Sequence, residues 1–128
     1  MELLLDTCCW LWWLSNPETL SKQQLEALIN PQNQLYLSVA TLWELSIKIN
    51  SGKLAAPKPL NELVATECPK DNIKLINIKP EHAIHAGSLP LHHKDPFDRM
   101  IIAQADLENL MIVTSDAIFA KYDVAILS

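Results

Sequence analysis

The fold of this chain is set by the stretch LLLDTCCWLWWL, residues 3–14. Leu3, Leu4 and Leu5 form a continuous apolar run, which is typical of a central parallel strand buried on both faces. Asp6 ends the run, and a short tryptophan-rich helix is predicted directly after it, over residues 8–14. The stretch therefore indicates a strand that passes at once into a helix, as in α/β folds.

Four further strands are predicted along the chain. Continuous apolar runs at 35–37, 111–114 and 124–127 indicate central strands, whereas IKLINI at 73–78 alternates and indicates an edge strand. The predicted helices between the strands cover residues 22–29, 39–50, 60–68, 81–87 and 96–107. Strands that alternate with helices, joined mostly by right-handed crossovers, predict a doubly wound α/β sandwich. The proline-rich residues 53–60 read as a surface connection, so we expect one domain over residues 1–128.

Composition excludes several classes of protein. A chain of 128 residues with 49% hydrophobic and 20% charged residues is long enough for one core and is not disordered. Its apolar runs fall short of the roughly 20 residues that cross a membrane, and MELLLD has no basic segment typical of a signal peptide. Three cysteines without a CxxC spacing predict a reducing compartment, the cytoplasm. A net charge of -5 argues against a nonspecific nucleic-acid coat.

Four carboxylates are predicted to meet at one edge of the sheet. Asp6 follows the first strand and Asp116 follows the fourth, and the carboxyl ends of parallel strands share one edge. Helices that follow strands begin at that same edge, and two of them carry Asp98 in a first turn and Glu44 in a second turn. This placement brings four scattered acids together.

Asp98 has an unusual position within HKDPFDRMIIAQA, residues 93–105. Asp95 is a suitable N-cap for a helix there, and helical spacing puts Asp98 on the same face as Ile101 and Ile102. A buried carboxylate costs several kcal/mol unless a cation or hydrogen-bond donors compensate it. Grouped carboxylates suit Mg²⁺ or Mn²⁺, and such an ion can activate a water against a phosphodiester.

Each acid also has a purely structural interpretation, and these stay open. Asp6 and Asp116 are suited to turns or caps. Glu44 can form an exposed pair with Lys48 four residues later. Asp98 can face its own N-cap as a variant of the capping box.

Four segments together resemble the PIN-domain family, in particular the VapC-type toxins of bacterial toxin–antitoxin pairs. They are LLLDTCCWLWWL at 3–14, SVATLWELSIKINSGKL at 38–54, LPLHHKDPFDRMIIAQA at 89–105 and IVTSDAIFAKYDV at 112–124. The resemblance implies a single-domain, three-layer α/β/α sandwich with a five-stranded parallel sheet. It also implies RNA cleavage that depends on Mg²⁺ or Mn²⁺, a homodimer, and a small antitoxin partner.

The resemblance assigns the site to Asp6, Glu44, Asp98 and Asp116. We therefore expect a metal-dependent endoribonuclease in which Asp6, Asp98 and Asp116 bind the ion, and Glu44 is a ligand or orients the attacking water. Cys8 departs from the family, where a histidine or a small polar residue is common at or near this position.

Several other residues are candidates for contacts with substrate or water. Thr114 and Ser115 offer hydroxyls, although a role at the end of the strand fits equally well. Lys48 lies near the predicted mouth, His93 can approach the substrate, and Arg99, the only arginine, can contact a phosphate or pair with an acid. The histidines at 82, 85, 92 and 93 fit no usual zinc module and are expected in loops or on the surface. The tryptophans at 10, 12 and 13 can stack on bases, or pack in the core or in a dimer contact.

Two other functions compete with the nuclease. One is a catalytically inactive PIN-like module that only binds. The other is a receiver-like signalling domain, which expects an acidic pair after the first strand and a lysine after the last. The single Asp6 and the terminal residues ILS argue against the receiver.

Overall fold

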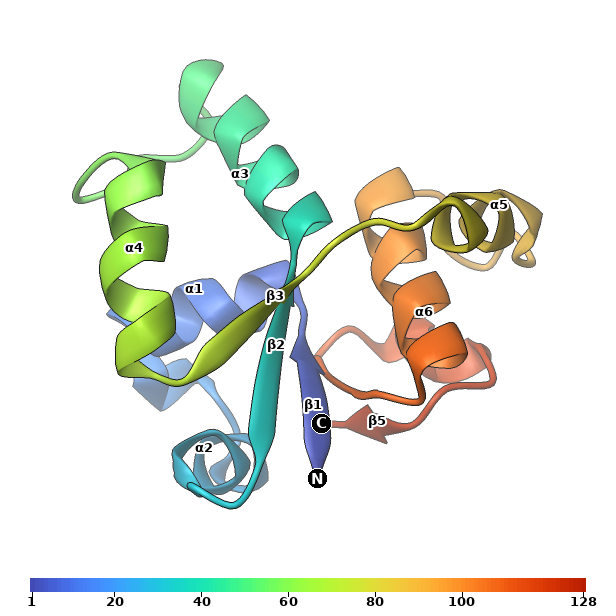
Figure 1. Ribbon diagram of the computed structural model, residues 1–128, viewed down its shortest axis with the longest axis horizontal. Coiled ribbons are helices and arrows are strands. Elements are labelled where there is room, and N and C mark those ends of the chain that lie inside the picture. The colour runs from blue at the N-terminus through green and yellow to red at the C-terminus, as the bar shows by residue number, and fades with distance from the viewer.

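The computed structural model describes the chain from Met1 to Ser128 as a parallel sheet between layers of helices (Figure 1). The strands are β1 (Glu2–Leu5), β2 (Gln34–Ser38), β3 (Ile73–Ile76), β4 (Met111–Val113) and β5 (Ile126–Leu127). Their order is β3-β2-β1-β4-β5, and every pair is parallel. The predicted three-layer α/β/α fold is confirmed. A receiver domain has the order 2-1-3-4-5, so the topology excludes that alternative.

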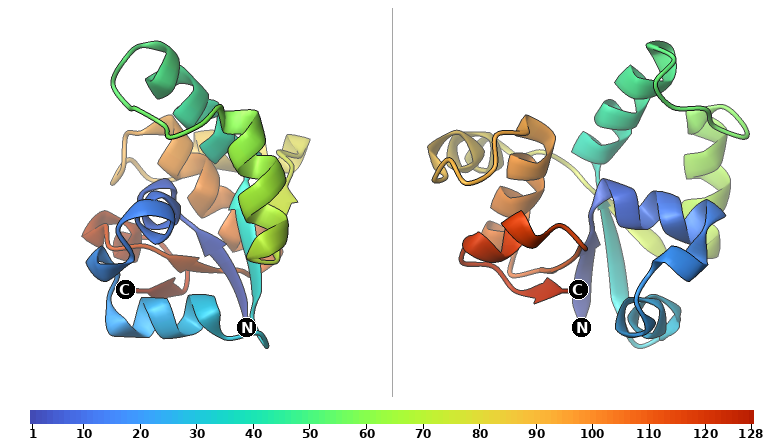
Figure 2. Two further views of the ribbon diagram at one scale, coloured as in Figure 1. Left: turned by 90° about the vertical axis from the view of Figure 1, so that its left-hand side faces the viewer. Right: turned by 180° about the vertical axis from the view of Figure 1, so that it is seen from behind.

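The helices lie close to their predicted positions. They are α1 (Thr7–Ser15), α2 (Lys22–Ile29), α3 (Val39–Asn50), α4 (Leu60–Lys70), α5 (Pro80–Ser88) and α6 (Pro96–Glu108), with short 3-10 helices η1 (Pro17–Thr19) and η2 (Ala117–Lys121). Helices α1, α2 and α4 lie on one side of the sheet and α5 and α6 on the other, as Figure 1 and the right-hand view of Figure 2 show. None of these helices combines the length and the apolar character that crossing a bilayer requires.

Two separate cores, one on each face of the sheet, explain the continuous apolar run of β1. Leu3 and Leu5 pack into a cluster with Trp10 of α1, whereas Leu4 faces a second cluster with Ile101 and Ile102 of α6. All three leucines are fully buried. Because successive side chains of a strand point to opposite faces, a strand covered on both faces has no polar position.

The last strand differs from its prediction. The run at 124–127 was expected to be central, but β5 is a two-residue strand at the edge of the sheet beyond β4. Ile126 packs against one core and Leu127 against the other, so both faces are covered although one edge is free. A continuous apolar run therefore indicates that both faces of a strand are buried. It does not indicate whether the strand has one neighbouring strand or two. The edge position predicted for 73–78 is confirmed by β3.

The start of α6 follows the sequence closely. The Asp95 carboxylate accepts hydrogen bonds from the backbone N–H groups of Phe97 (2.8 Å) and Asp98 (3.1 Å), which confirms it as the N-cap. Asn109 ends the helix in a left-handed conformation with φ 56°. These two residues fix where Asp98 stands relative to the sheet edge.

Candidate metal centre

The candidate site lies where the strand order reverses. From β1 the chain continues to β2 on one side of the sheet, while β4 lies on the other side of β1. Ligands of open parallel sheets bind beyond the carboxyl ends of the strands at such a point. Asp6 directly follows β1 and Asp116 follows β4 after Thr114 and Ser115, so both acids stand at this crevice.

Helices α3 and α6 bring the other two acids to the same place. A cavity of about 300 Å³ is lined by Asp6, Glu44, Asp98 and Asp116 together. Its lining also includes Lys48 and Ser115 of the candidate contact residues. The convergence of the four carboxylates expected from the sequence is therefore present.

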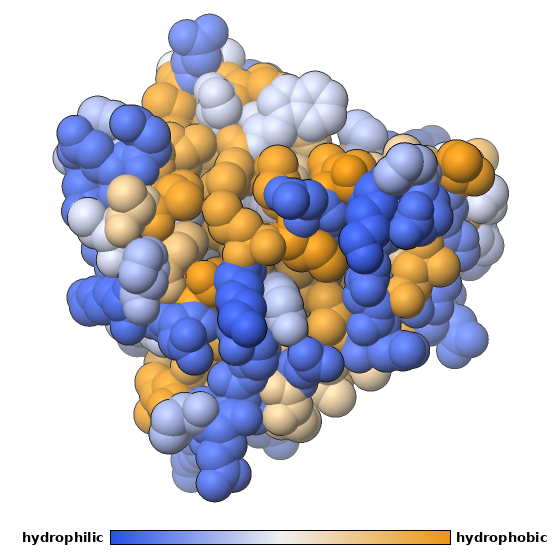
Figure 3. All heavy atoms as spheres, in the orientation of Figure 1, coloured by the Kyte–Doolittle hydropathy of each residue, from blue (hydrophilic) through white to orange (hydrophobic).

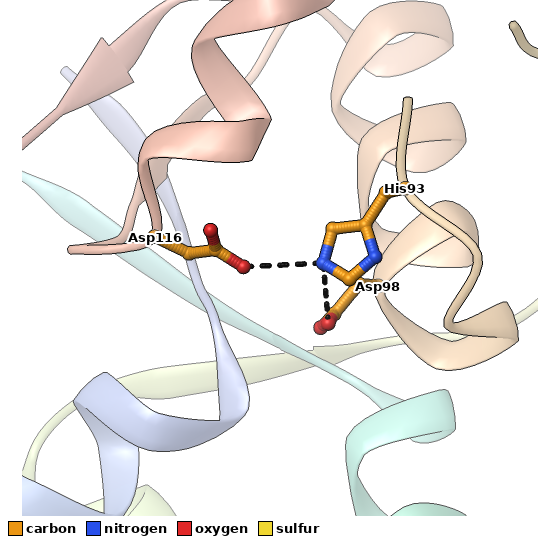
Figure 4. A group of neighbouring side chains, drawn as sticks. All are labelled: His93, Asp98 and Asp116. Carbon is orange, nitrogen blue, oxygen red and sulfur yellow. Dashed lines mark hydrogen bonds and ion pairs between the residues drawn. The ribbon is translucent and has the colours of Figure 1, made fainter. Parts of the chain in front are cut away.

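His93 forms the tightest group with two of these acids (Figure 4). Its Nε2 lies 3.0 Å from Asp98 Oδ2 and 3.1 Å from Asp116 Oδ2, and the three ligand atoms all lie within 4.8 Å of one another. Its Nδ1 accepts a hydrogen bond from the backbone N–H of Asp95 (3.3 Å), so Nε2 holds the proton and faces both carboxylates. His93 was expected to touch substrate, and its place as a candidate metal ligand was missed. It lies in the loop before α6, where no helical spacing connects it to Asp98.

Asp6 is fixed by two hydrogen bonds. Its Oδ1 accepts from the backbone N–H of Cys9 (2.7 Å) and its Oδ2 accepts from the Thr114 hydroxyl. Burial raises the pKa of Asp6, and these two hydrogen bonds oppose part of the increase. The structural interpretation of Asp6 as a cap of α1 is thus correct, and it coexists with the position at the cavity.

Thr114 joins Asp6 to Asp116. Its hydroxyl donates to Asp6 and accepts from the backbone N–H of Asp116 (3.1 Å), and only 1% of the residue is exposed. It therefore serves the end of the strand and does not reach a substrate. Asp116 in turn accepts from the backbone N–H of Ile118 (3.0 Å) and caps η2. Ser115 is exposed and borders the cavity.

Glu44 forms the predicted pair with Lys48, but the carboxylate is buried. Glu44 is 5% exposed, and its oxygens accept hydrogen bonds from the Thr7 hydroxyl (2.8 Å) and from Lys48 Nζ (2.9 Å). The hydrogen bond to Glu44 raises the pKa of Lys48, so the ammonium stays charged. Lys48 is the only lysine or arginine in the lining of the cavity.

The electrostatics of the cavity are unbalanced. Burial raises the pKa of Asp98 to about 7, and the carboxylates of Asp95, Glu44 and Asp6 add to the increase while His93 opposes it. The carboxylates outnumber the single lysine of the cavity and repel one another. A bound divalent cation would neutralise this excess negative charge. Carboxylate oxygens with one imidazole nitrogen form a donor set that suits Mg²⁺ or Mn²⁺, so the residues fit such an ion.

Arg99 occupies neither of its expected positions. It is 8% exposed, and its guanidinium donates to backbone carbonyls of Ala86 (2.8 Å), Leu89 (2.8 Å), Pro90 (3.0 Å) and His93 (3.1 Å). Carbonyls at the end of a helix lack partners within the helix, and the five N–H donors of an arginine supply them. Both the phosphate contact and the pairing with an acid are therefore wrong.

His82 and His85 have structural roles. His82 was expected near the surface but is fully buried, where its Nδ1 accepts from the backbone N–H of Lys79 and its Nε2 contacts Glu108 (2.9 Å). His85 contacts Asp106 at 2.6 Å. Both pairs connect α5 to α6, and neither forms a group of three metal-ligating side chains.

The tryptophans of α1 all pack against the first core. Trp10 is fully buried within it, and Trp12 and Trp13 are partly buried against it. Trp12 also lines the cavity of the acids, as does Cys8 one turn earlier.

Comparisons with known proteins agree with this geometry. The family model described as "PIN domain" matches residues 3–125. A search of curated protein sequences found no match. Similar solved structures include VapBC2 from Rickettsia felis bound to a DNA fragment from the promoter, with TM-score 0.73, 17% identity, and 99% of this chain and 98% of that chain covered.

Two further structures have the same fold. One is VapBC-1 from nontypeable Haemophilus influenzae, with TM-score 0.70, 19% identity, and 100% of this chain and 98% of that chain covered. The other is a toxin–antitoxin complex from Klebsiella pneumoniae, with TM-score 0.63, 19% identity, and 98% and 96% covered. The family model spans nearly the entire sequence and includes all four acids at the cavity. This chain belongs to the PIN-domain family.

Proposed function

We propose that this chain is a metal-dependent endoribonuclease and the toxin of a VapBC-type toxin–antitoxin pair, acting as one nuclease domain over residues 1–128. The observation that carries the proposal is the single cavity, lined by Asp6, Glu44, Asp98 and Asp116, at the switch point of the sheet. Four other cavities, at other places in the fold, each bring fewer carboxylates together.

The residues divide into those that hold the ion and those that hold the ligands in place. Asp6, Asp98 and Asp116 would bind Mg²⁺ or Mn²⁺, with Glu44 as a further ligand or as the group that orients the attacking water. A bound ion of this kind supplies a nucleophilic water and neutralises charge on the phosphodiester. Thr114 orients Asp6 and Thr7 orients Glu44, because each hydroxyl donates to the carboxylate.

His93 has a defined part in this arrangement. Its Nε2 faces Asp98 and Asp116 at once, within the distance of a ligand atom that they would share with an ion. The imidazole either holds the two carboxylates by donating its Nε2 proton, or it joins the ligand set as the other neutral tautomer, with the proton on Nδ1 and without the hydrogen bond from the Asp95 N–H. In both cases it acts at the metal and not on a remote part of the RNA.

The partners follow from the resemblance and from the named similar structures. We propose a small antitoxin protein as the regulatory partner, a homodimer as the assembly, and the cytoplasm as the location. The toxin–antitoxin complex from Klebsiella pneumoniae and the two VapBC structures support the antitoxin.

A cleavage assay on purified protein tests the proposal. Single-stranded RNA is incubated with wild type in Mg²⁺, Mn²⁺ or EDTA, and with Asp98→Asn in the same buffers. We expect cleavage only with metal and a loss of about a hundredfold or more in Asp98→Asn, the size of effect seen when an electrostatic group at a reaction centre is removed. Asp106→Asn is the matched control, since Asp106 lies in the same helix outside the acidic cavity.

The outcomes separate the alternatives. Equal cleavage by wild type and Asp98→Asn contradicts the role of Asp98. Absence of metal-dependent cleavage together with RNA binding favours the inactive binding module.

A further inference from the structure

An aromatic side chain borders the cavity beside the acids. Trp12 lies on α1 one helical turn after Cys8, and both line the space that Asp6, Asp98 and Asp116 share. The Trp12 ring is partly buried against the first core, so packing holds it while the remainder of the ring faces the cavity. A ring held in this way loses little entropy when a flat ligand stacks on it.

A cation stands on a different helix of the same cavity. Lys48 of α3 is 46% exposed and is held by Glu44 at 2.9 Å. The two helices are joined at the acids, because the Thr7 hydroxyl of α1 contacts both Glu44 (2.8 Å) and Thr41 (3.1 Å) of α3. From this joint Trp12 lies five residues along α1 and Lys48 lies four residues beyond Glu44 along α3. At about 1.5 Å per residue, each is roughly 6–8 Å along its helix from the joint.

The remaining tryptophans do not share this position. Trp13 packs against the same core but does not line the cavity of the acids. Trp43 is well exposed, but its ring packs edge-on against Phe97 with centroids 5.1 Å apart and borders a different, apolar cavity. Only Trp12 combines an exposed part of the ring with the acidic site.

We propose that Trp12 is a base-stacking platform and Lys48 a phosphate contact for the nucleotide beside the bond that is cleaved. The inference rests on the proposed ribonuclease function and names two side chains that position the RNA at this site. A base inside a duplex is already stacked on both sides, whereas an unpaired base can turn onto an aromatic ring. Stacking also suits a protein with net charge -5 and a single cationic side chain at the cavity, because charge attraction alone is weak there.

Binding measurements test this inference apart from cleavage. Fluorescence anisotropy follows a labelled ten-nucleotide single-stranded RNA of mixed sequence, the same strand in a duplex, and the same strand with abasic residues. All proteins have the Asp98→Asn substitution, which prevents cleavage under the proposed function, and the buffer contains Mn²⁺. We expect Trp12→Ala to bind the single strand about tenfold to a hundredfold more weakly. Trp12→Phe retains most of the affinity, and Trp13→Ala, the matched control, binds as the parent does.

The nucleic acids provide a second comparison that needs no variant of Trp12. The parent protein is expected to bind the abasic strand and the duplex about tenfold or more weakly than the single strand. Lys48→Met is expected to reduce the salt slope of binding by about 1, as for the loss of one phosphate contact. Because the base-dependence is measured on the parent, the test stands even if Trp12→Ala does not fold.

Three results overturn the inference: equal binding of abasic and base-containing strands, preference for the duplex, or unchanged affinity in folded Trp12→Ala. Failure to bind any of the three RNAs overturns it as well. The proposed function fails separately, when wild type with Mn²⁺ leaves RNA intact although binding depends on Trp12. Metal-dependent cleavage without any dependence on Trp12 sustains the nuclease and rejects the platform.

Discussion

Asp98 is the residue whose environment departs most from that of an ordinary surface acid. It stands in the first turn of α6, where the helix dipole favours a negative charge, yet burial and three neighbouring carboxylates disfavour it. Its own carboxylate does not cap the helix, because Asp95 already accepts both nearby backbone N–H groups. The charge on Asp98 is therefore relieved either by a proton or by a cation at the cavity.

The raised pKa of Asp98 makes the stability of the metal-free protein depend on pH. The pKa is raised from 3.8 to about 7, so between about pH 4 and 7 the folded chain keeps a proton that the unfolded chain releases. This group's contribution to the free energy of unfolding is full below pH 4 and is lost as pH rises toward 7 and above. We expect Asp98→Asn to remove this loss, measured by urea unfolding in EDTA at pH 5 and pH 8. The same pH difference in wild type and variant contradicts the assignment, and Asp123→Asn, at an exposed position, serves as the control.

Metal binding should depend on pH for the same reason. A proton on Asp98 competes with the cation, so Mn²⁺ is expected to raise the melting temperature by several degrees at pH 8 and by much less at pH 5. Thermal unfolding with and without Mn²⁺ at the two pH values measures this. Asp98→Asn should show a small shift at both. An equal Mn²⁺ shift of wild type at pH 5 and pH 8 excludes Asp98 as a ligand.

At the scale of the elements, sequence patterns within each segment predicted where the helices lie. The remaining features depend on contacts between segments that are far apart in the sequence. Asp95 caps α6 where the sequence indicated, because capping needs only neighbouring backbone. The helix predicted over residues 60–68 extends further, because α4 continues to Lys70 with Pro69 in its last turn. Carboxylates that follow strands or lie in the first two turns of helices predicted the cavity, since the carboxyl ends of parallel strands share an edge.

The errors concern side chains whose partners lie on other elements. Arg99 follows an acid in the sequence, but it turns to the carbonyls at the end of α5 and in the loop after it. His82 looks like an exposed helical histidine until α6 brings Glu108 against it. The sequence of one segment cannot predict which carbonyl or carboxylate another segment will place beside it. The order of the strands in the sheet cannot be predicted from local patterns for the same reason.

Arg99 is expected to hold the α5–α6 connection in place. Arg99→Met removes the donors of several carbonyls that are largely buried, so we expect the free energy of unfolding to fall by about 3 kcal/mol. Arg99→Lys should recover part of the loss, because an ammonium has fewer donors and no planar fork. Urea unfolding measures both. Lys94→Met, at an exposed position in the same loop, is the control and should change stability by less than about 0.5 kcal/mol. A comparable loss in both Met variants would refute this role.

At the scale of the whole molecule, apolar side chains remain uncovered on one face. Figure 3 shows apolar surface across the face that β3 and α3 present in Figure 1. The large exposed apolar residues of these elements and of the segment after β3 are Trp43, Ile47, Leu75 and Ile78. A contiguous apolar surface of this kind is uncommon on monomers and marks contact surfaces.

The proposed homodimer can be measured directly. We expect purified protein to show a mass about twice the 14.4 kDa of one chain by size-exclusion chromatography with light scattering. The mass should stay constant over a tenfold dilution from the micromolar range. A mass of one chain at all concentrations contradicts the dimer while leaving the nuclease proposal intact.

Asp6 and Asp116 fasten the first turn of α1 and of η2 in addition to facing the cavity. The same two carboxylates therefore serve both the stability of the fold and the candidate metal site. This double role limits which substitutions such a protein can accept during evolution. A lineage under pressure to silence its activity can exchange Asp98 for a neutral residue and gain robustness, whereas exchange of Asp6 or Asp116 loosens the scaffold. In related proteins that have lost the activity, the aspartate at position 98 should therefore be replaced first, while the aspartates at positions 6 and 116 are retained.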